Sequence, residues 1–118
     1  MNHFSLLVAV VMVIGQLVGF PPPAQAESTF QESMPEVVGK QCLGCHQVTK
    51  QRVGPAFLAI AKRYQEADNA SEYLVTMIRA GSRGQWGAIP MPAQTHVSEA
   101  EARQVADWLL SIDLDAVR

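Results

Sequence analysis

The sequence predicts an all-α domain, and three observations support this. Apolar residues recur three and four positions apart in several segments, which is the spacing of one buried helix face. No stretch alternates apolar and polar residues in the manner of a half-buried strand. The chain has 118 residues, a length suited to one domain, and shows no internal repeat.

The first helix is expected to begin near Pro35, because proline is favoured in the first turn of a helix. It runs through Val38 toward a pair of cysteines. Gly39 lies inside it, where glycine costs stability relative to alanine. We therefore expect either a close approach to the last helix, near Trp108, or a harmless surface glycine.

Two further helices follow in the middle of the chain. The first opens at Pro55, and its apolar face is formed by Phe57, Ile60, Ala61 and Tyr64. The second could be capped by Asp68, Asn69 or Ser71, of which Asn69 has capping-box spacing to Glu72, and it is expected to end at Gly81. Its apolar face is formed by Tyr73, Leu74, Met77 and Ile78.

Residues 81–94 contain three glycines and two prolines, so they are expected to be irregular. The last helix begins after them, where Ser98 and Glu101 have the spacing of a capping box. Its buried face is predicted to hold Val105, Trp108, Leu109 and Ile112.

Residues 1–26 are predicted to be a secretory signal peptide that is cleaved after Ala26. An uncharged, mostly apolar run over residues 4–20 is followed by three prolines and an A-x-A cleavage pattern at residues 24–26. An uncleaved membrane anchor is the alternative, because residues 1–3 contain no Lys or Arg. The run is short for a membrane span and holds glycines and a glutamine, which favours cleavage.

Export would place the mature protein in the periplasm, without stable membrane insertion. Residues 27–34 are polar and are expected to form a flexible mature N-terminus, followed by one domain over residues 35–118. Charged residues make up 17% of the chain and the formal net charge is −2, so the composition gives no indication of nucleic-acid binding.

The central motif is Cys42-Leu43-Gly44-Cys45-His46. Two cysteines separated by two residues and followed by histidine are typical of covalent attachment of a c-type haem. Each thiol adds across one haem vinyl group, so both sulfur atoms must lie on one side of a short turn. The histidine that follows is then tethered within bonding distance of the iron.

Two other chemistries use a similar pair of cysteines. A redox-active dithiol normally opens a helix after a strand in a βαβ unit, and no strand is predicted here. A zinc site needs further ligands, but the remaining candidates His3, His46 and His96 do not form a second pair at finger spacing. The haem interpretation is therefore favoured, and it agrees with export because bacteria attach haem c outside the cytoplasm.

Over residues 35–112 the chain resembles the short bacterial class I monohaem cytochromes c, the periplasmic type that donates electrons to nitrite reductase or terminal oxidases. The resemblance rests on CLGCH, Val53-Gly54-Pro55-Ala56, Gly81-Ser82 with Gly84, Trp86-Gly87, Ile89-Pro90-Met91-Pro92 and Asp107-Trp108-Leu109-Leu110, in this order. It implies about four helices wrapped around one covalent haem, with the terminal helices crossing.

The resemblance also implies roles for individual residues. Cys42 and Cys45 would carry the haem, and His46 and Met91 would be the axial ligands of the iron. The carbonyl of Pro55 would accept a hydrogen bond from the second ring nitrogen of the histidine. The indole N–H of Trp86 would bond a haem propionate. The rest of the expected haem pocket is formed by Val53, Phe57, Ile60, Ile78 and Ile89.

The sequence departs from the family pattern at three positions. Ala93-Gln94 stand where relatives have Pro-Asn, whose asparagine bonds the methionine sulfur. The stretch 94–97 is one residue longer, and Met77 replaces a basic residue that lies near the propionates in relatives. We therefore expect altered tuning of the methionine and one fewer propionate partner.

The function implied by the resemblance is that of a one-electron carrier rather than an enzyme. Its partners would be redox proteins such as a reductase, an oxidase or a dehydrogenase, and a monomer is expected. The alternative is a haem-based sensor, or a cytochrome subunit of an oxidoreductase complex, with a labile or histidine sixth ligand, and His96 is the residue available for this. A basic rim for docking is expected from Lys40, Lys50, Arg52 and Arg83.

Overall fold

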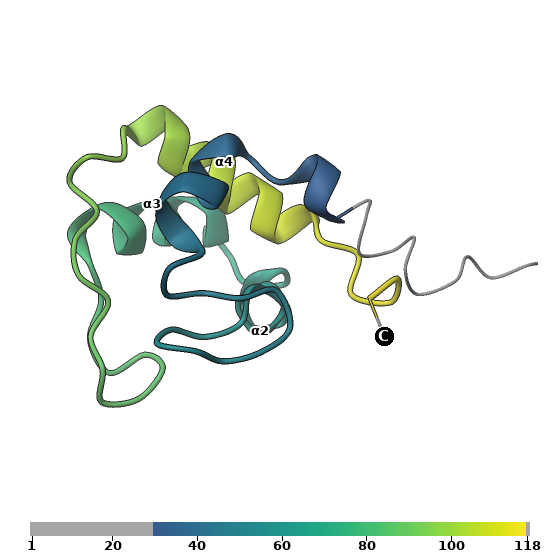
Figure 1. The fold of residues 1–118 in the computed structure, drawn as a ribbon, viewed down its shortest axis with the longest axis horizontal. Helices are drawn as coiled ribbons and strands as arrows, with labels where there is room; N and C mark the ends of the chain where they lie inside the picture. Colours follow the sequence, from purple (N-terminus) through teal and green to yellow (C-terminus); the bar gives the residue numbers. More distant parts are fainter. Residues whose placement is uncertain (1–29, 118) are drawn as a thin grey trace, which may run out of the picture.

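The structure is a computed structural model that describes residues 30–117 (Figure 1). Its helices are the π-helix η1 (Val38–Cys42) and the α-helices α2 (Phe57–Tyr64), α3 (Ala70–Ala80) and α4 (Glu99–Ser111). The described part of the chain contains no strand, apart from an isolated antiparallel bridge between Ser82 and Met91. The prediction of an all-α fold is therefore confirmed.

The N-terminal helical segment leads directly into the paired cysteines. After a turn at residues 36–37 the chain widens into the π-helix η1, which the Leu43 N–H closes by donating to the Val38 carbonyl at 3.3 Å. Figure 1 shows this blue segment lying across α4. Val37 and Val38 are buried in the same cluster as Val105 of α4. The terminal helices thus cross, as expected.

Residues 30–34 differ from the expectation of a loose N-terminus. Residues 30–33 form a helical turn, and the Phe30 side chain is only 7% exposed. Its ring lies 5.0 Å from that of Trp108, measured between centroids. Burial of an aromatic ring outweighs the polar composition of its neighbours, so the packed domain includes residues before Pro35. The predicted signal peptide and the cleavage site lie outside the described residues.

Gly39 does not mark the crossing of the terminal helices. It is exposed, and a Cβ atom placed on it would meet no other atom within 4 Å. The expected close approach is therefore wrong, and Gly39 is a surface glycine. Trp108 packs instead between Phe30 and Phe57, the latter at 5.2 Å between ring centroids.

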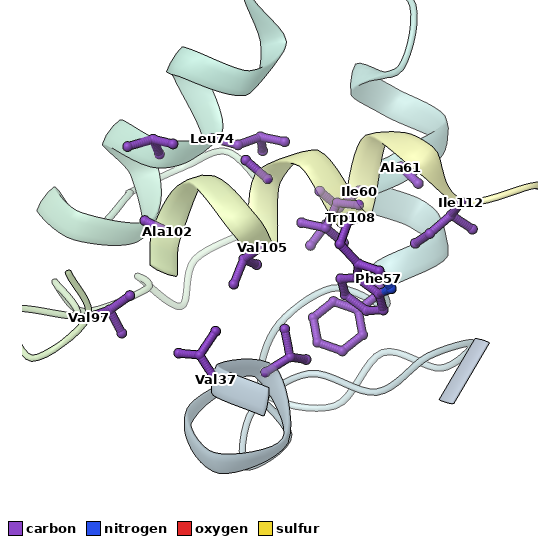
Figure 2. Close-up of a cluster of buried hydrophobic side chains, with 14 of the residues drawn as sticks. Val37, Phe57, Ile60, Ala61, Leu74, Val97, Ala102, Val105, Trp108 and Ile112 are labelled. Atoms are coloured by element: carbon purple, nitrogen blue, oxygen red, sulfur yellow. The ribbon is translucent and has the colours of Figure 1, made fainter. Parts of the chain in front are cut away.

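The core lies between α4 and the other elements (Figure 2). The α4 face that was predicted to be buried is buried: Val105, Trp108, Leu109 and Ile112. The helix begins with the predicted capping box, because the Glu101 N–H donates to Ser98 Oγ at 3.2 Å and the Ser98 N–H donates to Glu101 Oε2 at 2.9 Å. This helix is therefore specified by local sequence as well as by packing.

The start of α3 does not follow the predicted capping box. Asn69 precedes the helix in the left-handed conformation, with φ of 57°, and its side chain makes no capping hydrogen bond. An N-cap residue normally has an extended backbone, so this conformation excludes the predicted capping box, and Glu72 instead forms an ion pair with Arg103 of α4 at 2.7 Å. None of the described helices has both the length and the apolar character needed to cross a membrane.

Candidate functional site

A largely apolar cavity lies between the N-terminal segment, the helices and the loop before α4. Its empty volume is about 1310 Å³, part of it open to solvent. The residues predicted to attach and ligate the haem all line it, as do the predicted pocket residues: Cys42, Cys45, His46, Met91, Val53, Pro55, Phe57, Ile60, Ile78, Trp86 and Ile89. The fold thus brings together residues that are up to 49 positions apart in the sequence (91 minus 42).

Cys42 is the last residue of the π-helix η1 and Cys45 lies three residues after it, and the two are not joined in a disulfide. Burial raises the pKa of the Cys42 thiol to about 11, and the neighbouring Cys45 contributes to the shift. A dithiol that acts as a nucleophile needs the opposite shift, toward the thiolate at neutral pH. Together with the absence of a strand before the motif in the described chain, this disfavours the dithiol interpretation.

His46 is held in one orientation by its surroundings. The imidazole is 8% exposed, and its Nδ1 lies 2.7 Å from the carbonyl oxygen of Pro55. A carbonyl only accepts, so Nδ1 carries the proton and Nε2 keeps its lone pair for a metal. The ring also stacks on Phe57, with 5.4 Å between centroids and 21° between planes.

Gly54, in the Val53-Gly54-Pro55-Ala56 motif, makes room for the ring of His46. A Cβ atom on residue 54 would lie 2.5 Å from Cε1 of His46, closer than such contacts allow. The Gly54 N–H also donates to the Cys45 carbonyl at 2.8 Å, which holds this segment against the motif. The sequence signal is a glycine directly before the proline whose carbonyl orients the histidine.

Met91 is placed by its backbone. Its N–H donates to the Ser82 carbonyl at 2.9 Å, and its carbonyl accepts from the Ser82 N–H at 3.0 Å. Gly81 has φ of +80°, and a Cβ atom there would come within 2.7 Å of the Met91 carbonyl oxygen. Glycine is needed at this position both for its positive φ and for the close approach of the two segments.

His96 and Gln94 follow Met91 but lie in different surroundings. His96 is exposed, is not part of the cavity wall, and its Nε2 lies 2.9 Å from Oε1 of Gln41. Gln94 does line the cavity, but its side-chain amide donates to the Pro92 carbonyl at 2.8 Å. Of the two candidate sixth ligands, only Met91 is therefore in the cavity.

The donor set suits a covalent haem rather than a bare metal ion. The described residues contain no cluster of three or more His, Cys, Asp or Glu side chains that could hold a metal ion. Two thiols, one oriented imidazole and one thioether around an apolar cavity are the groups that fix and ligate a c-type haem. The residues present fit this group.

Comparison with known proteins gives the same result. The family model described as cytochrome c oxidase, cbb3-type, subunit III matches residues 30–109. Cytochrome c-552 of Nitrosomonas europaea is 48% identical over 71 residues, which are 60% of this chain and 69% of that protein. Cytochrome c-551 of Stutzerimonas stutzeri is 35% identical over 108 residues, which are 92% of this chain and 97% of that protein. The crystal structure of the wild-type Nitrosomonas europaea cytochrome c552 superposes with a TM-score of 0.59 at 47% identity, covering 61% of this chain and 100% of that chain.

The fold and the cavity define a small class I cytochrome c. The chain belongs to the family described as cytochrome c oxidase, cbb3-type, subunit III, and its relatives include the small cytochromes c-552 and c-551. It is a monohaem c-type electron carrier with one covalently attached haem c.

Proposed function

We propose that the protein is a periplasmic one-electron shuttle, not an enzyme, in which Cys42 and Cys45 carry the haem and His46 and Met91 ligate its iron. The observation that carries this proposal is the shared cavity of these four residues, from which His96 is absent. When bound there, the haem supplies a single site that accepts and releases one electron.

The protein groups around this site favour electron transfer over binding of an external ligand. The Pro55 carbonyl holds the Nδ1 proton of His46, which makes Nε2 a better donor. Met91 is fixed by two backbone hydrogen bonds, so the second axial position is expected to stay filled. A thioether favours the reduced iron and raises the reduction potential. A sensor needs one position that is open or labile, whereas both candidate ligands of the proposed carrier, His46 and Met91, line the cavity.

Optical spectra of the purified oxidised and reduced protein test the ligand assignment. Covalent haem, a low-spin iron and a sulfur-to-iron charge-transfer band are expected. Met91→His should abolish that band and lower the potential while the iron stays low-spin, because imidazole stabilises Fe(III) more than a thioether does. His96→Ala is the matched control and should leave the spectrum unchanged. Loss of the low-spin spectrum in His96→Ala would instead establish bis-histidine ligation.

The intact mass of the exported protein tests both attachment and processing. We expect the mass of the chain from Glu27 plus one haem, with both thiols of Cys42 and Cys45 used in attachment. A longer chain would indicate the uncleaved membrane anchor. A mass with an internal disulfide and no haem would exclude the proposed function altogether.

Brief docking with redox partners follows from the proposed shuttle. A carrier has to leave its partner after each transfer, and such encounters use small interfaces, below about 1,200 Å². Val53 and Ile89 are 49% and 65% exposed and also line the cavity. We propose that this side of the molecule meets the reductase, oxidase or dehydrogenase, with the protein itself remaining a monomer.

A further inference from the structure

Arg63, near the end of α2, makes two contacts with the loop between α3 and α4. Its Nη1 donates to the carbonyl oxygen of Gln85 at 2.6 Å. Its guanidinium carbon lies 4.6 Å from the ring centroid of Trp86, which places the cation over the ring. Gln85 and Trp86 are neighbours in the chain, so the Arg63 side chain contacts both the backbone and an aromatic ring of the loop.

The loop has few other attachments. The bridge between Ser82 and Met91 closes its base. Within the described residues, the bond from Arg63 is the only hydrogen bond that joins residues 83–90 to another part of the chain. Gly84 and Gly87 both have positive φ, 70° and 112°. Glycine adopts many backbone conformations at little cost, so these two residues do not fix the shape of the loop by themselves. The position of this loop therefore depends on side-chain contacts.

The loop matters for the site because it carries part of the cavity wall. Trp86 is half-buried and lines the cavity, and the bridge that ends the loop sets the backbone of Met91. Met77 also lines the cavity and carries no charge. Arg63 is thus the cation that contacts Trp86 in this protein.

We propose that Arg63 is a positioning residue that clamps Trp86 and the loop ending at Met91 onto α2. The inference rests on the proposed function, because the clamped loop supplies the proposed sixth ligand. The flat guanidinium can stack on an indole ring while one of its N–H groups bonds a carbonyl beside that ring. An ammonium group has the same charge but no plane to stack, so lysine cannot make both contacts in this way.

Three variants of the holoprotein separate the clamp from its charge. Arg63→Gln removes the charge and the stacking, and Arg63→Lys keeps only the charge. Lys62→Gln is the matched control, because it removes the same charge from the neighbouring exposed position of α2. The readouts are hydrogen exchange of the Ser82 and Met91 amides, which bond each other across the loop base, and the midpoint potential of the haem.

The clamp predicts that both Arg63 variants speed exchange of these two amides by roughly tenfold, equivalent to about 1.4 kcal/mol. The midpoint potential should fall in both, because a looser loop weakens the bond from the thioether, which favours the reduced iron. Lys62→Gln should match the wild type in both readouts. The proposal is overturned if exchange in Arg63→Lys equals the wild type, or if Arg63→Gln equals Lys62→Gln.

Failure of the clamp and failure of the proposed function give different results. If the wild-type spectrum lacks the sulfur-to-iron band, the proposed ligand is wrong, whatever the Arg63 variants do. The contacts of Arg63 lie within the protein, so exchange of the two amides still decides the clamp in that case. If the band is present and the Arg63 variants exchange these amides at the wild-type rate, the proposed function is retained and the clamp is rejected.

Discussion

Gly54 leaves the space that the imidazole of His46 occupies. A methyl group there would lie 2.5 Å from Cε1, and the ring has little freedom to move because Pro55 holds Nδ1 and Phe57 stacks on its face. Gly54→Ala should therefore lower the free energy of unfolding by about 1–3 kcal/mol, as is usual for overpacking. Denaturant unfolding monitored by haem absorbance measures this change.

Gly39→Ala is the control for that substitution. Gly39 is exposed with no atom near its would-be Cβ, so alanine should be neutral or stabilise the protein by about 0.5–1 kcal/mol. A Gly54→Ala protein as stable as Gly39→Ala, with an unchanged spectrum, would mean that the histidine is not confined as the structure indicates.

At the scale of single elements, the C-terminal end of α4 is capped from outside the helix. The side-chain amide of Gln65 donates to the carbonyl oxygens of Ile112 at 2.6 Å and Leu110 at 3.3 Å. Gln65→Leu removes both bonds while keeping similar bulk, and unpaired buried acceptors cost about 1–3 kcal/mol. We expect a lower denaturant midpoint. Gln104→Leu on the exposed face of the same helix should have little effect, and an equal loss in both variants would refute the capping role.

The N-terminal end of α4 should make stability depend on pH. Hydrogen bonds from the side chain and backbone of Ser98 hold the pKa of Glu101 below its usual value. A carboxyl group with a lowered folded-state pKa stabilises the protein above its unfolded-state pKa, and this contribution is lost as the pH falls through the folded-state pKa. Unfolding midpoints measured between about pH 3 and 7 should therefore fall less steeply on the acid side in Glu101→Gln than in the wild type.

Glu66→Gln is the control for the pH experiment, because Glu66 makes no hydrogen bond or ion pair within residues 30–117. The unfolding midpoint of Glu66→Gln should fall with decreasing pH as steeply as that of the wild type. If the unfolding midpoints of the wild type and Glu101→Gln fall equally steeply with decreasing pH, the capping box makes no contribution to stability that depends on pH.

The elements show what sequence could and could not predict. The capping box of α4 and the buried faces of α2 and α4 depend on local spacing, so they were predictable. The start of α3 was not, because Asn69 adopts a left-handed conformation that the spacing of Asn69 and Glu72 does not reveal. Likewise Phe30 is buried by Trp108, 78 positions further along (108 minus 30), and no local pattern reveals such a contact. The site residues are recognisable from motifs, but the role of Gly54 appears only when the histidine ring is in place.

At the scale of the whole molecule, the structure reduces the expected basic rim from four residues to three. Lys40 forms an ion pair with Glu36, both exposed, so it adds little net charge to the surface. Lys50, Arg52 and Arg83 are exposed, and each lies within three residues of the cavity-lining residues Val53 or Gly84. These three side chains are therefore the better candidates for steering an acidic redox partner.

Replacing Lys50, Arg52 and Arg83 by glutamine should slow bimolecular electron transfer at low salt, and added salt should erase the difference. Stopped-flow rates across a salt series measure this, with an unchanged haem potential as the check on the site. Lys40→Gln is the control and should change the rate much less. If the rates change neither with the substitutions nor with salt, the carrier function is unaffected, and recognition is assigned to the apolar surface at Val53 and Ile89.

The paired backbone bonds between Ser82 and Met91 also bear on how this chain can change over evolutionary time. Directly after them, the Gln94 N–H donates to the Ile78 carbonyl at 3.0 Å. Val97 is the next anchored residue, because it is 3% exposed and its N–H donates to the Gln94 carbonyl at 3.0 Å. Residues 95 and 96, both exposed, thus span the gap between two anchored positions. A residue gained or lost there shifts neither the methionine nor the register of the last helix. Lineages of such proteins are therefore free to differ in length at this point while the chemistry upstream stays constant.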